Sequence, residues 1–569
     1  MVLEETSLQN YEKHSSYGIL QNDNSCQEPP QYKIDPIEMT IGNFGRWQLR
    51  ISILMALLKL SVAWCTLSIV FMAPPTQFWC TPPDKYKNMS EKQWLAVSKP
   101  KDPHSHKQEG MNSGYCEMID LENDPTGTIP CEFGYSYNKT VFSRTIVSEW
   151  DLICGHERLI DLTQVTLMLG VLIGNIVFGV MADKKGRKKV LITCIWMQSL
   201  LAVLASFWPW FWGFVLIRFF LGIANGGTMV TSFVLCMEVV GGKWRTIVPI
   251  LYQIPFGFGN SIMSGLAYLL RDWREFHLAL SFLISTFIVY TWCLPESPRW
   301  LLVLGRKEEA IEVLKKAATE NKIDDETFQI ALTGLSNVDP TDNETPCLSA
   351  LFSTRQLKKR SFLLYLNWTI CGITFYAFSQ YLGHVGSNIF LTVGVSGFIA
   401  LPGTVLCVVL VGTFGRRWTI CSAYLTCAVC FLAIIFMPKN VFIHDWPRVI
   451  LAAVGIVGMS ISMPALYLFT SELYPTILRN AGVGVCIMFS RIGSMLAPLV
   501  IALEDIGPSV PLIILTIAAL AEALLILLLP ETAGSILPET VKDLDRQTDK
   551  DFGGYITVPS KSSEENGSP

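Results

Sequence analysis

The sequence predicts an all-α integral membrane protein whose twelve helices form two related bundles of six. Hydrophobic residues make up 50% of the 569-residue chain and charged residues only 16%, and the mean hydropathy is +0.38. Soluble chains of this size carry more charge and less apolar content. The apolar residues gather in blocks of about 20 residues, the length that a helix needs to cross the hydrocarbon core of a bilayer.

An internal repeat divides the chain into two halves. Three motifs occur twice in the same order, at offsets of 229, 234 and 235 residues (186 to 415, 238 to 472 and 295 to 530). They are Gly186-Arg187-Lys188 with Gly415-Arg416-Arg417, Glu238 and Arg245 with Glu472 and Arg479, and Pro295-Glu296-Ser297 with Pro530-Glu531-Thr532. We therefore interpret the chain as a duplication, an architecture that is common among helical membrane proteins.

Twelve spans follow from the apolar blocks. The first half contains spans over residues 50–73, 159–181, 190–208, 210–236, 246–270 and 276–294. The second half contains spans over residues 361–382, 388–412, 418–437, 447–470, 477–503 and 508–529. Residues 1–40 are polar and have no apolar signal-peptide core, so we interpret them as a disordered tail.

A long polar segment, residues 74–158, separates the first two spans. It contains Cys80, Cys116, Cys131 and Cys154, and two glycosylation sequons at Asn88 and Asn138. Four cysteines in such a loop indicate two disulfides in an oxidising compartment, with three pairings open. The alternative, four free thiols in a cytosolic loop, disagrees with the sequons. We therefore expect an extracellular, glycosylated loop.

Charge decides the expected orientation. Basic residues concentrate in the loops after the even-numbered spans, most clearly in residues 184–189, so the positive-inside rule places these loops and both termini in the cytosol. Residues 308–318 have helical apolar spacing and predict an amphipathic helix. The expected division is a cytosolic tail (1–49), a first bundle with the extracellular loop (50–294), a cytosolic linker (295–360), a second bundle (361–529) and a cytosolic tail (530–569).

Several motifs resemble those of a known superfamily. Gly179-x-x-x-Asp183-x-x-Gly186-Arg187-Lys188 resembles the loop motif of the major facilitator superfamily, and residues 218–226 resemble its second motif. Residues 146–154, 295–301 and 472–484, with the large first loop, resemble the organic cation/anion/carnitine transporter family. Sugar porters share the motif at Asp183 but usually lack the large loop. The resemblance covers residues 44–532 and implies a secondary solute carrier of the plasma membrane.

The charged residues of the repeated motifs are candidates for conformational gating. The expected pairs are Glu238 with Arg245, Glu472 with Arg479, Asp183 with Arg187, and Glu296 with Arg299. We hypothesise that they lock the two halves together when the carrier faces outward and separate when it faces inward. The alternative is that they only fix the orientation of loops and helices. Gly412 stands where the first half has Asp183, so the lock is expected to be asymmetric.

Ionisable residues inside spans are the first candidates for the substrate site, because each is costly in a bilayer unless it is paired or hydrated. In the family that the chain resembles, cation carriers have an Asp at the place of Arg491, whereas anion and carnitine carriers have an Arg. A guanidinium there suits a carboxylate. Pairing of Arg491 with Glu522 is the alternative. Lys59 is either a second anion site or a snorkelling or neutral lysine.

Aromatic and polar residues of spans five and seven complete the candidate site. Aromatic rings bind an ammonium group by cation–π contacts. The candidates are Gln253, Phe256, Phe258 and Asn260 in span five and Trp368, Phe375, Tyr376 and Tyr381 in span seven. Glu522 in span twelve is a candidate for ion coupling, by carrying a proton or helping to bind sodium.

These observations predict a secondary transporter that moves a small organic ion by alternating access. The expected substrate is an organic anion or a carboxylate-bearing zwitterion, such as a carnitine-like molecule or an amino-acid derivative. The alternatives are an organic cation transporter, then a sugar porter or a non-transporting relative. Neither a Gly-x-x-x-x-Gly-Lys-Ser/Thr nor a His-Glu-x-x-His motif occurs, so we expect no enzymatic activity, no cofactor and no metal site.

The expected partners are the organic ion, the lipid bilayer and a coupling cation, either sodium or a proton. The formal net charge of −4 gives no reason to expect a nucleic acid.

Overall fold

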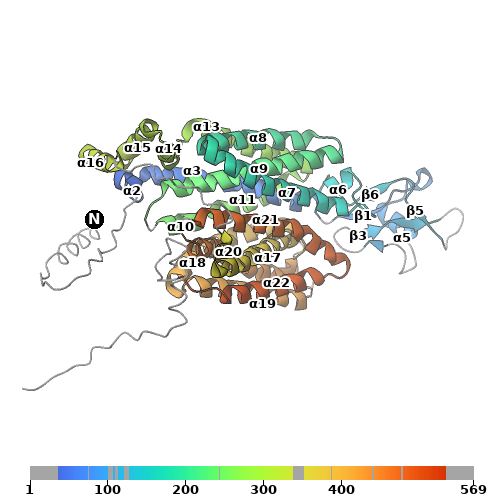
Figure 1. Cartoon of the computed structure of the whole chain (residues 1–569). Coiled ribbons are helices and arrows are strands. Elements are labelled where there is room, and N and C mark those ends of the chain that lie inside the picture. The colour runs from blue at the N-terminus through green and yellow to red at the C-terminus, as the bar shows by residue number, and fades with distance from the viewer. Residues whose placement is uncertain are drawn as a thin grey trace, which may run out of the picture.

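The structure is a computed structural model that describes residues 36–74, 76–99, 107–108, 113–120, 127–242, 244–336, 351–385, 388–438, 441–475 and 478–532. Two helical bundles lie against each other along their length (Figure 1). Strands of the 74–158 segment lie at one end of the molecule, which we call the loop side. The linker helices over residues 298–336 lie at the opposite end, which we call the linker side (Figure 1). The predicted tails over residues 1–35 and 533–569 lie outside the described residues.

The first bundle holds spans one to six. Their elements are α3 (Arg46–Leu67) with α4 (Ile69–Met72), α7 (Arg158–Lys185), α8 (Arg187–Phe207), α9 (Phe211–Val239), α10 (Trp244–Leu251) with α11 (Ile254–Leu270), and α12 (Trp273–Ser285) with η2 (Thr286–Val289) and α13 (Tyr290–Cys293).

The second bundle holds spans seven to twelve. Their elements are α17 (Arg355–Val385), α18 (Ile389–Phe414), α19 (Arg416–Phe436), η4 (Ile443–Asp445) with α20 (Trp446–Leu473), α21 (Arg479–Ala502) with η5 (Leu503–Asp505), and α22 (Val510–Leu527). Across the described residues, 11 helices are long and apolar enough to cross a membrane. The prediction of a twelve-helix fold in two halves is confirmed. Span five differs from the prediction because it is divided into two helices.

Span five corrects the prediction of one helix over residues 246–270. It is divided into α10 and α11, and the break lies at Tyr252 and Gln253. Pro255 occupies the first turn of α11. A proline is favourable there, because it has no N–H to bond, but it cannot continue a helix from the residues before it. The break places Gln253 at the junction of the two pieces.

The linker helices are fixed to the start of span one. They are α14 (Pro298–Val303), α15 (Lys307–Asn321), which contains the predicted amphipathic helix, and α16 (Asp325–Ser336). The Asn321 side chain accepts a hydrogen bond from the Trp47 N–H at 2.9 Å and donates to the Ile41 carbonyl at 3.0 Å and to Gln48 Oε1 at 2.8 Å. Both polar atoms of this side chain therefore join α15 to α3 or to α2 (Pro36–Ile41), the helix that precedes it.

The segment before span one corrects the prediction that residues 1–40 are disordered. Residues Pro36–Ile41 form the helix α2, which packs against α15 and α16 (Figure 1). The Glu38 carboxylate accepts a hydrogen bond from the Gly242 N–H at 3.0 Å and lies 3.4 Å from Arg245. Packing against α15 and α16 and the contacts of Glu38 with Gly242 and Arg245 together hold this short helix in place.

The large loop contains β-strands that the all-α prediction did not include. A four-stranded sheet has the order β2 (Lys107–Gln108), β3 (Ser113–Tyr115), β1 (Gln77–Cys80), β6 (Tyr135–Tyr137), and β4 (Glu117–Ile119) pairs with β5 (Thr128–Pro130). The loop also contains η1 (Asp84–Tyr86), α5 (Glu91–Ser98) and α6 (Ile146–Glu149). Disulfides join Cys80 to Cys131 and Cys116 to Cys154, which selects one of the three open pairings.

The sequons lie on the surface of the loop. Asn88 is exposed, and Asn138 is half-buried and donates a hydrogen bond to Gln77 Oε1 at 3.2 Å. Glycosylation of both remains a proposal.

The Ser-Glu-Trp-Asp stretch ties the loop to the first bundle. Glu149 accepts hydrogen bonds from Trp273 Nε1 at 2.7 Å and from Arg274 Nε at 3.0 Å, and Trp150 Nε1 donates to the Pro209 carbonyl at 3.1 Å. Tyr137 donates to Asp151 at 2.8 Å. Burial and the Asp151 carboxylate raise the pKa of Tyr137, so it remains a protonated donor at neutral pH.

The repeated Pro-Glu motif caps the helix that begins with the repeated Gly-Arg motif. Glu296 accepts a hydrogen bond from the Lys188 N–H in the first turn of α8 at 2.9 Å. Glu531 accepts from the Arg416 and Arg417 N–H groups at the start of α19, both at 3.0 Å. A carboxylate at a helix N-terminus contributes about 0.3–1 kcal/mol and satisfies N–H groups that have no partner within the helix. The duplicated sequence thus forms a duplicated contact.

The glycine before α8 is required by this contact. Gly186 has a φ of 107°, and a Cβ atom there would lie 2.6 Å from Glu296 Oε2. A side chain at this position would strain the backbone, at about 1–3 kcal/mol, and displace the capping carboxylate.

Gly186→Ala is therefore expected to destabilise the protein more than Gly305→Ala does. Gly305 also has a positive φ, 73°, but a Cβ there meets no atom within 4 Å. The comparison separates backbone strain from loss of the cap, and the melting temperature of the purified protein in detergent, followed by intrinsic fluorescence, measures it. Equal melting temperatures for the two variants would contradict the role of Glu296 as a cap.

Candidate functional site

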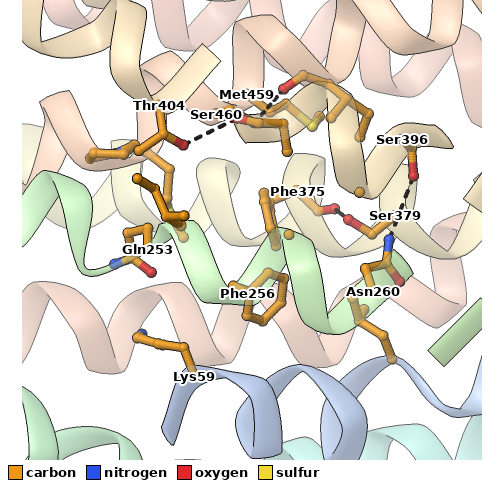
Figure 2. Close-up of a pocket in the computed structure, with 18 of the residues that line it drawn as sticks. Lys59, Gln253, Phe256, Asn260, Phe375, Ser379, Ser396, Thr404, Met459 and Ser460 are labelled. Atoms are coloured by element: carbon orange, nitrogen blue, oxygen red, sulfur yellow. Dashed lines mark hydrogen bonds between the residues drawn. The ribbon is translucent and has the colours of Figure 1, made fainter. Parts of the chain in front are cut away.

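A cavity of about 920 Å³ lies between the two bundles. Its wall combines residues of α3, α9 and α11 from the first half with residues of α17, α18, α20 and α21 from the second. Seven of the predicted substrate-site residues line it: Lys59, Gln253, Phe256, Asn260, Phe375, Tyr376 and Arg491, five of which are labelled in Figure 2.

Arg491 brings a buried positive charge to the wall of the cavity. Its side chain is 1% exposed, Nη1 donates to the Tyr376 hydroxyl at 2.6 Å, and Nη2 lies 3.5 Å from Met229 Sδ in the opposite half. Nε has no hydrogen-bond partner. The alternative pairing with Glu522 is not formed: no described carboxylate lies within 4 Å of Arg491. The guanidinium therefore keeps bonding capacity for a ligand.

Lys59 supplies a second basic side chain to the same cavity. It is 3% exposed, and its Nζ lies 4.9 Å from the centre of the Tyr252 ring, a cation–π contact. The Tyr252 hydroxyl shares a hydrogen bond of 2.7 Å with Ser232. Lys59 is close enough to Arg491 for their charges to repel. Its side chain does not snorkel out of the bundle but lines the cavity (Figure 2).

The described residues that line the cavity include no Asp or Glu. Two cations therefore face the cavity without an acidic partner in its wall. A buried charge without a counter-charge costs several kcal/mol, and an anion that enters the cavity reduces this cost.

Asn260 joins the halves at the edge of the cavity. Its Nδ2 lies 3.4 Å from the Val393 carbonyl and 3.5 Å from Ser396 Oγ on α18 (Figure 2). Gln253 lies at the break in span five and faces the cavity from the other end of α11.

Three predicted residues lie elsewhere. Trp368 is fully buried behind the cavity, where its Nε1 donates to Thr470 at 3.0 Å and its ring packs edge-on against Tyr467. The hydroxyl of Tyr381 lies 3.4 Å from the Pro508 carbonyl, and Phe258 is 42% exposed on the outer surface. These three side chains do not line the cavity, since they face neighbouring helices or the outside, and we no longer include them in the site.

The sequence reasoning missed several cavity residues. Ser379, Ser396, Thr404, Ser460 and Tyr467 all line it. Each of the four smaller hydroxyl groups donates to a carbonyl of its own helix at 2.6–3.2 Å, so its lone pairs are the part available to a ligand. Hydroxyl residues are common in spans, and only helix packing shows which of them face a cavity.

Contacts between α11 and α18 close the loop side. Ser261 Oγ donates to the Gly394 carbonyl at 2.9 Å, and Ser264 Oγ donates to the Phe390 carbonyl. The Phe390 ring inserts among three rings of the first half, those of Phe71, Phe142 and Tyr268, at centroid distances of 5.2–5.9 Å. This aromatic cluster separates the cavity from the loop side.

The gating residues form ion pairs within each half. Arg187 Nη2 lies 2.9 Å from Glu238 Oε1, and Arg187 Nη1 lies 2.9 Å from Asp183, as predicted for the latter pair. In the second half, Arg416 lies 2.9 Å from Glu472. The arginine that follows the repeated glycine is therefore the salt-bridge partner of each acid, which corrects the predicted pair of Glu238 with Arg245. Glu472 also attracts the charge of its predicted partner Arg479, but the two form no salt bridge within 4 Å.

The other gating residues have different neighbours. Glu296 accepts hydrogen bonds from the Lys188 and Ser297 N–H groups, which corrects its predicted pairing with Arg299. Arg479 Nε donates to the Ser471 carbonyl at 2.7 Å. Arg245 and Arg479, from opposite halves, lie close enough for their like charges to interact. In this conformation the salt bridges between described residues of the repeated motifs join helices of one half, and none of them joins the two halves.

Comparison with known proteins agrees with this architecture. Residues 122–543 match the sugar (and other) transporter family. Rat solute carrier family 22 member 3 is 32% identical, over 89% of this chain and 94% of its own length. The organic cation transporter protein of Drosophila melanogaster is 30% identical (94% and 97% covered), and pig organic anion transporter 3 is 31% identical (89% and 92%).

A solved structure shows the same fold. The xylose transporter of E. coli, in a partially occluded inward-open conformation, superposes with a TM-score of 0.58 at 15% identity, over 86% of this chain and 100% of that one.

The chain is thus a multi-pass membrane protein of the major facilitator superfamily, in the sugar (and other) transporter family. Within that superfamily it belongs to solute carrier family 22, whose organic cation and anion transporters match it at 29–32% identity over most of its length. The family resemblance predicted from the motifs is therefore confirmed.

Gly397→Val is expected to disfavour the closed loop side. A Cβ at Gly397 would lie 2.4 Å from Ser261 Oγ and 2.6 Å from the Gly257 carbonyl, so a larger residue separates α18 from α11. Labelling of a Phe390→Cys variant with a maleimide should become several-fold faster in the Gly397→Val background, after subtraction of the signal from the exposed Cys293.

Gly412→Val on the same helix is the matched control, because a Cβ there meets no atom within 4 Å. Equal labelling rates in the two backgrounds would show that the α11–α18 contact does not hold the loop side closed.

Proposed function

We propose that the protein is a secondary transporter of organic anions or carboxylate-bearing zwitterions, such as carnitine-like molecules or amino-acid derivatives, and not an enzyme. The substrate binds in the cavity between the halves, with its carboxylate on Arg491. The observation that carries this proposal is a cavity wall with two cations, Arg491 and Lys59, and no acidic residue among the described residues that form it. A monovalent cation would meet only repulsion from these two groups.

Arg491 is suited to grip a carboxylate. A guanidinium offers two parallel N–H groups that match the two oxygens, and such bonds are stronger in a buried site than in water. The present partner of Nη1 is the neutral Tyr376 hydroxyl, so a carboxylate replaces a neutral acceptor with a negatively charged one. Lys59 adds electrostatic attraction for the carboxylate, whereas the directional hydrogen bonds come from Arg491.

Hydroxyl groups and aromatic rings of the cavity wall favour a substrate with a donor group. The hydroxyl groups of Ser379, Ser396, Thr404 and Ser460 present acceptor lone pairs, and the rings of Phe256 and Phe375 lie beside them (Figure 2). A hydroxyl or ammonium group is the chemical complement of such a wall. This arrangement supports a zwitterion whose carboxylate and ammonium groups are separated by a few bonds.

An organic cation transporter is the second candidate. The names of several relatives favour it, among them the Drosophila organic cation transporter protein. The aromatic and hydroxyl wall would serve a cation as well. The two uncompensated positive charges argue against it.

The loop side is proposed to be extracellular and the linker side cytosolic, in the plasma membrane. The basic loops of the repeated motifs lie on the linker side, whereas the disulfides and sequons lie on the loop side, so two independent signals agree. Alternating access then requires the α11–α18 contacts and the Phe390 cluster to separate when the cavity opens outward.

Arg491→Ala is expected to lower the uptake of carboxylates by about 30-fold to 4,000-fold, because a buried charged hydrogen-bond partner contributes about 2–5 kcal/mol. Arg491→Lys keeps the charge but not the two-pronged contact, so it should retain partial uptake with a higher KM. Uptake of labelled benzoate, glutarate, carnitine and tetraethylammonium into cells that express each variant measures this, normalised to surface protein.

Tetraethylammonium is the matched probe without a carboxylate. Carboxylate uptake with unaltered KM in Arg491→Ala would remove Arg491 from the substrate site, and selective uptake of tetraethylammonium by the wild-type protein would favour the second candidate function.

A further inference from the structure

Glu522 of α22 is buried without a partner for its charge. Its side chain is 0% exposed, and neither carboxylate oxygen has a hydrogen-bond partner. It forms no salt bridge with any residue that the structure describes within 4 Å. Neither the substrate cavity nor the ion pairs of the linker side account for this acid.

The helices around Glu522 present neutral groups to it. Thr374 of α17 and Tyr424 of α19 lie near the carboxylate without reaching hydrogen-bond geometry. The thiols of Cys371 on α17 and Cys427 on α19 are also nearby. From α21, the closest charged group is Arg491, which lies beyond Cys371 and is bonded to Tyr376.

An ionised carboxylate in such a place costs several kcal/mol, so the group must bind a proton or a metal cation. Sodium sites in transporters draw on backbone carbonyls that unwound helices release. Here α17, α19 and α22 are continuous helices, and their carbonyls are used within the helices. Apart from the carboxylate, the site offers only a few side-chain oxygens, such as those of Thr374, Tyr424 and Asn367. A proton needs none of these ligands.

Glu522 lies one layer of side chains behind the cavity wall. Cys371, which is close to the carboxylate, has its Sγ 3.4 Å from Sδ of Met463, and Met463 lines the cavity. Thr374 precedes Phe375, another residue of the wall. An ionised Glu522 therefore repels an anion in the cavity, whereas the protonated acid does not. Because such coupling is reciprocal, a bound anion also favours protonation of Glu522.

We infer that Glu522 is the proton-binding site of a proton–organic anion symporter, an inference that rests on the proposed function. The proton binds one carboxylate oxygen before the loaded carrier closes. After the cavity opens to the other face and the anion leaves, the O–H bond breaks and the proton passes to water. No other reactant is needed, and one proton accompanies each anion.

Proteoliposomes with a pH-sensitive dye inside test this inference. The substrate is whichever labelled carboxylate of benzoate, glutarate and carnitine gives the fastest saturable uptake. With wild-type protein, uptake should acidify the lumen, and an inward proton gradient of one pH unit should give about tenfold accumulation, since one unit corresponds to 1.36 kcal/mol. Glu522→Gln, which resembles the protonated acid in shape and charge, should exchange labelled for unlabelled substrate but show neither acidification nor accumulation.

Glu312→Gln is the control, because Glu312 is exposed on α15 and pairs with Lys316. Carboxylate uptake by the wild type without proton movement would overturn the inference and leave the proposed function intact, whereas no uptake of any carboxylate would contradict the proposed function itself. Proton-driven accumulation that persists in Glu522→Gln would also overturn the inference. So would accumulation driven by a sodium gradient and lost in that variant, which would make Glu522 a sodium ligand instead.

Discussion

The uncompensated positive charge of the central cavity is the constraint on which the rest of the structure depends. Arg491 is almost fully buried between the two bundles, and among the described residues it donates a hydrogen bond to the hydroxyl of Tyr376 and has no acidic partner. Such a charge destabilises the empty protein. Rigid halves, packed around close helix contacts, are needed to keep it there, and the binding of an anion recovers part of the cost. The site is in this sense prepared for its ligand before the ligand arrives.

Each half is made rigid by the same contact used twice. On the linker side, the arginine after the repeated glycine forms a salt bridge with an acid of the fourth span of its half: Arg187 with Glu238, and Arg416 with Glu472. The acid of the Pro-Glu motif, Glu296 or Glu531, caps the helix that begins at this arginine. These contacts stay within one half, so a movement of one half against the other does not require them to break. The contacts that must change lie elsewhere, between α11 and α18 and around the ring of Phe390. Because the strong polar contacts lie within each half and the closing contacts lie between the halves, we expect the two halves to move as rigid bodies about the central cavity.

The sequence revealed the spans, the duplication and the buried charges, because each leaves a local mark. Lys59, Arg491 and Glu522 stand out in apolar stretches, and the first two line the cavity. The partner of Glu238 was predicted wrongly, since an acid and a base seven residues apart suggested a local pair, whereas helix packing brings Arg187 closer. Phe390 and the hydroxyl groups of the cavity have no distinguishing pattern in the sequence. Their role arises only when two distant helices meet, which hydropathy does not encode.

The bonds of Asn321 have a consequence for how movement is distributed. Because this side chain joins α15 to the first residues of α3, and α2 packs against α15 and α16, the linker helices α14–α16 belong mechanically to the first half. A spectroscopic probe on α15 would thus travel with α3 and α7, and would report the swing of the second half as a change in distance to α19 or α22. A binding protein directed at α14–α16 would recognise the carrier in every stage of its cycle.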